Sequence, residues 1–385
     1  MANPLLPLNA TVALPKPRLG DLLAALRARD YTVHGPTVRD GVLRYGPVIS
    51  PDDLPRGYVV RQQPGRYRLE YTGHGDYFAV TPGPDTWKRD LFPPRQALFH
   101  LRRNGEGWEV VAAAEKPPRL ALLGVRPCEL AAIHVQDRVF LRQDFSDPHY
   151  RAVRERLFLV AVNCLHPAET CFCAAWGTGP EATGGYDLLL TELDDVFLAT
   201  VGSEAGREVL QPLGWEPAGA SLLDLARQRL EAARAGMTRR LPVAPDRLPD
   251  LLLSRLEHPH WEAVALRCLS CANCTQVCPT CFCWGVEDAI ALNGDEVTRF
   301  RVWDSCFSPQ LSYLAGGGNA RPTVKARYRQ WLTHKFASWQ RQFGVPGCVG
   351  CGRCITWCPA GIDVIAELAA LTADREEDAL QGGGR

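Results

Sequence analysis

Residues 268–280 read CLSCANCTQVCPT, and residues 348–360 read CVGCGRCITWCPA. Both stretches follow the pattern Cys-x-x-Cys-x-x-Cys-x-x-x-Cys-Pro, and their starts lie 80 residues apart. Three cysteines spaced by two residues wrap a tight loop around one face of an iron–sulfur cube. The fourth cysteine stands apart, and the proline after it steers the chain away. This repeat predicts two [4Fe-4S] clusters.

The fourth cysteine of each motif decides how the clusters are held. In two-cluster ferredoxins it ligates the other cluster. By that logic, the first cluster is held by Cys268, Cys271, Cys274 and Cys358, and the second by Cys348, Cys351, Cys354 and Cys278. Each motif could instead close on its own fourth cysteine, and the spacing does not exclude this. Zinc is disfavoured, because a tetrahedral site built from two Cys-x-x-Cys knuckles has no use for the remaining cysteines of each motif.

Seven of the fifteen cysteines lie outside these motifs. Cys128 and Cys164 each follow a predicted strand, and α/β sheets present ligands at the carboxyl ends of strands. With Cys171 and Cys173 they could hold a third cluster, the alternative being buried, inert thiols. Three cysteines are expected to be packing or neighbouring sulfurs around the clusters, namely Cys281, Cys283 and Cys306.

The 385 residues are 46% hydrophobic and 22% charged, which is ordinary globular composition and excludes disorder of the whole chain. Residues 241–252 hold three prolines and predict a linker. We therefore expect a mixed α+β protein, with an α/β domain over 1–245 and a mostly helical, ferredoxin-like domain over 246–385.

Hydrophobic periodicity predicts the elements of both parts. Apolar or alternating runs predict strands at 66–71, 77–81, 97–103, 108–113, 119–125, 157–162, 186–193 and 195–202. Helical spacing predicts helices at 20–31, 129–140, 221–240, 261–271, 327–344 and 361–371.

Charge and targeting signals narrow the function classes. Lys plus Arg and Asp plus Glu both count 43, so the net charge is 0 and the basic footprint of a nucleic-acid binder is missing. No apolar run approaches the roughly 20 residues of a membrane span, and the first residues lack a signal peptide's cationic start and apolar core. We expect a cytoplasmic protein, where clustered cysteines more often bind metal than form disulfides.

No catalytic arrangement of side chains is visible. Residues 177–182 (GTGPEA) fit a relaxed dinucleotide pattern, but Pro180 and the lack of a directly preceding strand oppose this interpretation. Asp194 and Asp195 are predicted turn residues, and His258 and His260 a loop feature. We therefore expect no complete active site on this chain.

Several further segments give the chain a family resemblance. They are Trp87-Lys88 with LFPPR, GVRPCELAAI, NC with TCFC and GTGP, CLSCANCTQVCPTCFCW, WDSCFSPQ, AGGGNARP and CVGCGRCITWCP. With them the chain resembles the iron–sulfur β subunit of cytosolic NAD(P)-linked nickel–iron hydrogenases (sulfhydrogenases), and it is similar to the electron-transfer subunit of anaerobic sulfite reductase.

The resemblance implies an electron-transfer role within a complex. Partners would be a reductase subunit that binds flavin and NAD(P), together with the hydrogenase small and large subunits, or the catalytic subunit of a sulfite reductase. The eight motif cysteines match the family's ferredoxin-type ligands. A self-contained redox enzyme with its own nucleotide site is a further alternative.

Overall fold

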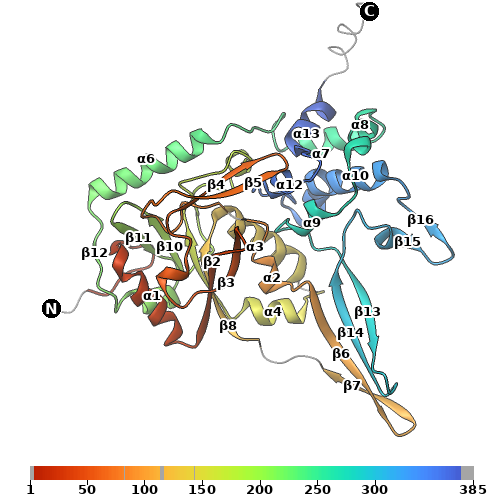
Figure 1. Cartoon of the computed structure of the whole chain (residues 1–385), viewed down its shortest axis with the longest axis horizontal. Helices are drawn as coiled ribbons and strands as arrows, with labels where there is room; N and C mark the ends of the chain where they lie inside the picture. Colours follow the sequence, from red (N-terminus) through yellow and green to blue (C-terminus); the bar gives the residue numbers. More distant parts are fainter. Residues whose placement is uncertain (1–3, 82, 113–116, 143, 374–385) are drawn as a thin grey trace, which may run out of the picture.

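The computed structural model describes residues 4–81, 83–112, 117–142 and 144–373 (Figure 1). The last twelve residues of the predicted C-terminal domain lie outside this range. Within the described residues, no helix is long and apolar enough to cross a membrane.

An eight-stranded mixed sheet forms the centre of the N-terminal part. Its spatial order is β12 (Glu216–Pro217), β1 (Thr11–Pro15), β11 (Val196–Val201), β10 (Leu188–Glu192), β9 (Leu157–Val162), β8 (Arg119–Val125), β2 (Tyr31–Arg39) and β3 (Val42–Pro47). Strands β10, β9, β8 and β2 pair in parallel, and the outer pairs β1–β11 and β2–β3 are antiparallel. The carboxyl ends of β8, β9 and β10 therefore share one edge.

Both faces of the parallel strands are covered, as their near-continuous apolar sequences require. In β8, Ala121 and Leu123 pack with α1 in one core, while Leu120 and Leu122 pack with α3 and α4 in another. The helices of the N-terminal part are α1 (Leu19–Arg27), α2 (Lys88–Leu91), α3 (Pro127–Phe140), α4 (Pro148–Arg154), α5 (Glu204–Leu210) and α6 (Ala220–Gly236).

Residues 77–81 do not form the predicted strand. The amides of Tyr77 and Phe78 donate to the carboxylate of Glu192, each at 2.8 Å. The Arg126 guanidinium donates to the carbonyls of Phe78 and Val80, at 2.6 Å each. All five residues are buried, but two buried charged side chains replace a neighbouring strand as the hydrogen-bonding partner.

The C-terminal part is built from short helices around the two cysteine motifs. They are α7 (Leu248–Ser254), α8 (His260–Arg267), α9 (Asn273–Gln276), α10 (Val324–Thr333), a π-helical turn (His334–Ser338), α11 (Trp339–Phe343), α12 (Arg353–Thr356) and α13 (Val364–Thr372). The mixed α+β class with a C-terminal ferredoxin-like domain is thus confirmed.

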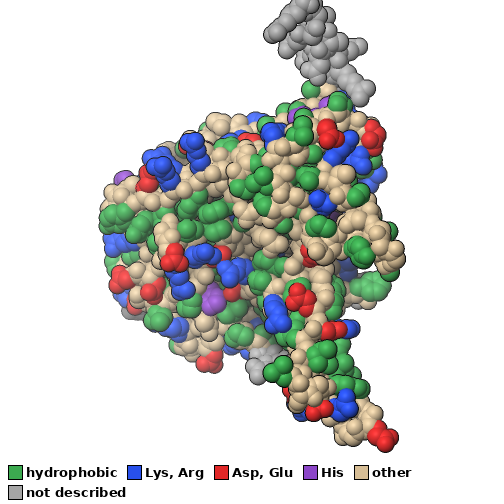
Figure 2. Space-filling view, turned by 45° about the vertical axis from the view of Figure 1, so that its right-hand side comes forward, with side chains coloured by type: hydrophobic (Ala, Val, Ile, Leu, Met, Phe, Trp, Pro, Cys, Tyr) green, Lys and Arg blue, Asp and Glu red, His purple; other side chains and the backbone are tan. Residues whose placement is uncertain are grey.

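A four-stranded arm joins the two parts of the chain. The sequence patterns predict two of its strands, at 97–103 and 108–113 (residue 113 lies outside the described residues), and miss the two between 284 and 303. Strands β13 (Trp284–Ile290) and β14 (Glu296–Trp303) form a hairpin that continues a second hairpin, β6 (Arg95–Asn104) with β7 (Gly107–Ala112). The arm extends away from the body (Figure 1), and hydrophobic side chains reach its surface (Figure 2). The β6–β14 ladder crosses the predicted boundary at residue 245, which itself stays a prediction.

The remaining elements are small. They are the hairpins β4 (Tyr58–Gln63) with β5 (Arg66–Tyr71) and β15 (Tyr313–Leu314) with β16 (Gly318–Asn319), and the 3-10 helices Lys16–Arg18, Pro51–Asp53, Cys173–Trp176 and Gln310–Ser312.

Candidate iron–sulfur centres

The two cysteine motifs fold into copies of one loop. The residue two positions after the first cysteine has a positive φ in both copies, at Ser270 (51°) and Gly350 (64°). Its amide donates to the sulfur of that first cysteine, Cys268 or Cys348, at 3.4 Å in each case. A second positive φ follows the middle cysteine, and short helices, α9 and α12, carry the third. The sequence repeat is therefore also a backbone repeat.

The first predicted ligand set lines one cavity. Cys268, Cys271, Cys274 and Cys358 all border it, so a cysteine of the second motif joins three of the first. The other walls are mainly apolar and include Phe307, Tyr328, Trp331, Ile362 and Val364, together with Cys354. Burial raises the pKa of the Cys274 thiol well above its usual value, and the neighbouring thiolates raise it further.

The second predicted set is also gathered in space. Burial raises the pKa of Cys354 well above its usual value, with further contributions from the charges of Cys348, Cys351 and Cys278. Burial likewise raises the pKa of Cys348 to about 12, against the opposing charge of Lys335. Thiols this hard to ionise alone become thiolates when iron ligates them, because a coordinating thiol is deprotonated. The donor chemistry fits iron–sulfur ligation.

The thiols surround a volume and do not converge on a point. Within the described residues, no three His, Cys, Asp or Glu side chains lie close enough together to hold a single metal ion. A cubane places four irons and four sulfides between its cysteines, so its ligands stay farther apart than those of a zinc ion. The arrangement suits a cluster better than the zinc alternative.

The four N-terminal cysteines come together beside the second motif. Cys128 lies in the first turn of α3 and Cys164 follows β9, at the carboxyl edge of the sheet. Burial raises the pKa of Cys173, and the charges of Cys171, Cys164 and Cys351 add to this rise. These four thiols are between 5% and 9% exposed.

The loop that carries Cys171 and Cys173 closes over the second motif. The amide of Phe172 donates to the carbonyl of Gly350 at 2.8 Å. A Cβ on Gly350 would lie 2.6 Å from the backbone of Cys173, and one on Gly352 would lie 2.3 Å from the Thr170 carbonyl oxygen. Glycine is thus required at these two positions, whereas the first motif carries Ser270 and Ala272 there, both also with a positive φ.

Cys281 lies beside Cys278 of the second set, whereas Cys283 and Cys306 pair with each other and the charge of Cys274, in the first set, acts on Cys306. The sulfur of Cys283 is 3.7 Å from that of Cys306. Cys281 adjoins Cys278, and the contact lowers the pKa of Cys278 well below its usual value. Their placement agrees with the expected role as neighbouring sulfurs, which stays a prediction.

Lys335 is a functional candidate that sequence reasoning missed. It is 4% exposed, and its ammonium donates to the Cys278 sulfur at 3.3 Å, to Thr280 Oγ1 at 2.8 Å and to the Gly347 carbonyl at 2.9 Å. Burial acts to lower the pKa of Lys335, but the negative charges of Cys278 and Cys281 outweigh it and raise this pKa well above its usual value. No sequence signal could have found it, because it lies 57 residues from Cys278.

A buried ion pair links the second motif to the N-terminal sheet. Arg353, between Cys351 and Cys354, donates to Glu129 of α3 at 2.6 Å, and both residues are 1% exposed. The hydroxyl of Tyr45 donates to the same carboxylate at 2.8 Å. This contact holds the motif against the carboxyl edge of the sheet.

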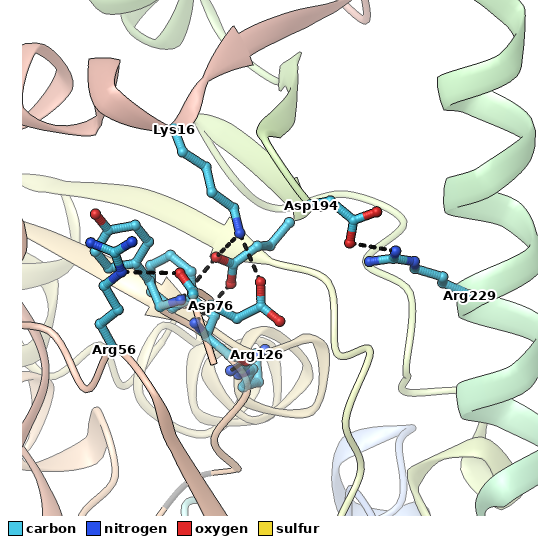
Figure 3. A network of polar contacts seen from close by, with 10 residues as sticks. Lys16, Arg56, Asp76, Arg126, Asp194 and Arg229 are labelled. Atoms are coloured by element: carbon cyan, nitrogen blue, oxygen red, sulfur yellow. Dashed lines mark hydrogen bonds and ion pairs between the residues drawn. The ribbon is translucent and has the colours of Figure 1, made fainter. Parts of the chain in front are cut away.

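Charged side chains at the carboxyl edge of the sheet form ion pairs with one another (Figure 3). Lys16 bonds to Asp76 at 2.7 Å and to Glu192 at 3.0 Å. Asp194, in the turn before β11, pairs with Arg229 of α6 at 2.7 Å. These pairs hold the irregular segment 76–81 and the sheet edge, and they offer no nucleophile with a matching base.

The glycine-containing stretch 177–182 supports the N-terminal cysteines. A Cβ on Gly179 would meet the Cys173 sulfur at 2.9 Å, and the amide of Ala182 donates to Asn163. Thr178 donates to the carbonyl of Val349 at 2.8 Å. The stretch packs between the sheet edge and the second motif, which accounts for Gly179 without a dinucleotide, while Gly177 has a φ of 66°.

Comparison with known proteins agrees with this geometry. The family of 4Fe-4S dicluster domains matches residues 267–362, which span both motifs. The β subunit of sulfhydrogenase 2 from Pyrococcus furiosus is 31% identical over 347 residues, covering 87% of this chain and 91% of that protein. No solved structure is significantly similar to the chain.

Proposed function

Because the chain belongs to the family of sulfhydrogenase β subunits, we propose that it is the electron-transfer subunit of an NAD(P)-linked nickel–iron hydrogenase. The observation that carries this proposal is the gathering of eight motif cysteines into two separate sets. When bound, [4Fe-4S] clusters supply one-electron redox chemistry. The residues of the chain itself bind the clusters, exclude water from them and set their reduction potentials.

The proposed ligands follow the crossed arrangement. Cys268, Cys271, Cys274 and Cys358 hold the first cluster, in the apolar cavity that these four residues line. Cys278, Cys348, Cys351 and Cys354 hold the second. Amide donors to Cys268, Cys348 and Cys358, each at 3.4 Å, stabilise negative charge on the sulfurs.

A third cluster is proposed at Cys128, Cys164, Cys171 and Cys173. Its support is that four buried thiols from three separate segments meet beside Cys351, where single inert cysteines would have no reason to gather. The three sites would then form a path from the first motif, through the second, to the edge of the sheet.

The proposed partners are a reductase subunit that binds flavin and NAD(P), together with the hydrogenase small and large subunits, in the cytoplasm. Cys271 is the only exposed thiol in the described chain, and Leu269 beside it is 67% exposed. The arm also presents Val110 and Ile290 to solvent, at 67% and 69%. Exposed apolar surface of this kind is typical of contacts between subunits.

Metal analysis of the anaerobically purified chain tests the proposal. We expect about eight iron atoms per chain for two clusters, or about twelve for three, with broad brown absorbance. A zinc-loaded, iron-free protein would contradict it. Tight binding of NAD(P)H or flavin to the isolated chain, measured by calorimetry, would favour a self-contained enzyme instead.

The partner proteins test the choice of family branch. The sequence is also similar to the electron-transfer subunit of anaerobic sulfite reductase, and electron transfer would be the chain's role in either complex. The complex purified from its native cells is expected to contain nickel. Sirohaem in place of nickel would identify the sulfite reductase branch.

A further inference from the structure

Two of the chain's five lysines are buried close to the cysteine motifs. Lys88 is 5% exposed and Lys335 is 4% exposed. Lys88 donates to the Gln276 carbonyl at 3.4 Å and lies 3.8 Å from the centre of the Trp303 ring. Burial lowers the pKa of Lys88 to about 8, and the negative charges of Cys281 and Cys278 act against this shift. Both lysines therefore lie close to the same thiols, those of Cys278 and Cys281.

Neither buried lysine has a carboxylate partner among the residues that the structure describes. Among the described residues, the lysine–carboxylate ion pairs involve Lys16 and Lys325. A buried ammonium without an opposite charge is costly. Neutral thiols do not compensate it, whereas the thiolates of a bound iron–sulfur cluster do. The two buried lysines thus indicate that negative charge lies beside them when a cluster is bound.

Within the described residues, no lysine bonds to a sulfur of the first ligand set, although the charge of the buried Arg327 acts on Cys268. Arg267, which lies near Cys358, is half exposed and bonds to both oxygens of Glu367 at 2.8 Å. Arg327 donates to Ser270 Oγ and to two backbone carbonyls. The two copies of the motif therefore differ in charge, although their loops share one backbone.

We propose that Lys335, by placing a buried positive charge on Cys278, holds the reduction potential of the second cluster above that of the first. This inference rests on the proposed function. Reduction adds an electron to the cluster, and a nearby cation stabilises the added charge strongly in a low-dielectric interior. Lys335 thereby favours residence of the electron at the inner site, next to the N-terminal thiols.

Redox titration of the full-length, cluster-loaded chain, followed by electron paramagnetic resonance, tests the inference. In Lys335→Met we expect the midpoint potential of the second cluster to fall while that of the first stays unchanged. Cys271→Ser assigns the signal of the first cluster. Lys325→Met, which removes a surface lysine paired with Glu262 at 3.4 Å, is the matched control and is expected to shift neither potential.

Two further variants separate charge from hydrogen bonding. Lys335→Gln keeps a hydrogen-bond donor toward Cys278 but loses the charge. The midpoint potential of the second cluster should therefore fall in this variant, as it does in Lys335→Met. Lys88→Met removes a buried charge without removing a bond to Cys278, and should shift the same cluster in the same direction, by less. It also decides the question if the Lys335 variants fail to assemble the cluster.

The outcomes are distinct. A wild-type potential in Lys335→Gln would assign the effect to the hydrogen bond and overturn the charge argument. Unchanged potentials in Lys335→Met and Lys88→Met would overturn the inference, while the clusters themselves remain. A wild-type chain without cluster signals would instead contradict the proposed function.

Discussion

Cys278 lies four residues after Cys274, yet its surroundings are those of the other motif. Lys335 donates to the Cys278 sulfur, and the negative charge of Cys278 acts on Cys348 and Cys354. Cys358 conversely lines the cavity of Cys268. In both motifs the third cysteine lies in a short helix, α9 or α12, and the fourth cysteine follows after that helix ends. Chain proximity is therefore a poor guide to which thiols share a cluster.

Iron loss in single and double variants tests this crossed assignment. Cys271→Ser and Cys278→Ser should each cost about four iron atoms per chain, because each removes a ligand of one cluster. If the assignment is crossed, the double variant loses about eight, since two different clusters are affected. Iron analysis with electron paramagnetic resonance measures this. A double variant that loses only about four would show that each motif closes on itself.

Gly352 is fixed by its neighbours as well as by its backbone. Its φ is 74°, and a Cβ would meet the Thr170 carbonyl oxygen at 2.3 Å. We expect Gly352→Ala to destabilise the chain by about 2–4 kcal/mol, from backbone strain plus displacement of the Thr170–Cys173 loop. Gly105→Ala is the control, because Gly105 has a φ of 61° and nothing within 4 Å of its Cβ position. Equal losses in denaturant unfolding would contradict the role of the loop contact.

At the scale of elements, the best predictions came from buried strands and amphipathic helices. The apolar runs at 119–125 and 157–162 are strands β8 and β9, and the helical spacing at 221–240 became α6. Segment 77–81 is buried like a strand but has no strand beside it, because Glu192 and Arg126 take its hydrogen bonds. The hydrophobic pattern indicates burial and does not indicate which groups bond to the backbone.

Glu192 is expected to hold this segment in place. Glu192→Gln loses one acceptor oxygen for the amides of Tyr77 and Phe78 and the charge opposite Lys16. Because all of these groups are buried or partly buried, we expect a loss of about 1–3 kcal/mol in the free energy of unfolding. Asp194→Asn, at the 71%-exposed partner of Arg229, should cost less than about 0.5 kcal/mol. A similar cost for both would contradict the argument.

At the scale of the whole molecule, the two parts of the chain are interlocked. The β6–β14 ladder, the Thr170–Cys173 loop on Gly350, and the Arg353–Glu129 pair each cross between them. Composition suggested a linker at 241–252; residues 241–247 do lie between α6 and α7, but 248–252 form the start of α7. Contacts from distant segments nevertheless bind the second motif to the sheet.

The Arg353–Glu129 pair gives a measurable link between the parts. Glu129→Gln leaves the buried guanidinium without its counter-charge, so we expect a loss of about 3–5 kcal/mol in stability. Glu129→Leu with Arg353→Met should recover part of that loss. Glu257→Gln is the control, since Glu257 pairs with Arg329 at 2.8 Å but is 84% exposed. Denaturant unfolding measures the stability of the wild type and of these three variants. Equal stability of Glu129→Gln and the wild type would contradict a structural role for the pair.

The sequence alone determined the local chemistry: two cubane-type motifs, buried strands that end next to cysteines, and the mixed α+β class. These follow from spacing and periodicity, which are properties of neighbouring residues. Only the tertiary structure decided that Lys335 faces Cys278, that Glu129 reaches Arg353, that four N-terminal thiols meet beside Cys351, and that β13 and β14 continue β6. Such contacts join residues tens to hundreds of positions apart. No local pattern encodes them, because they arise only when the packed elements bring those residues together.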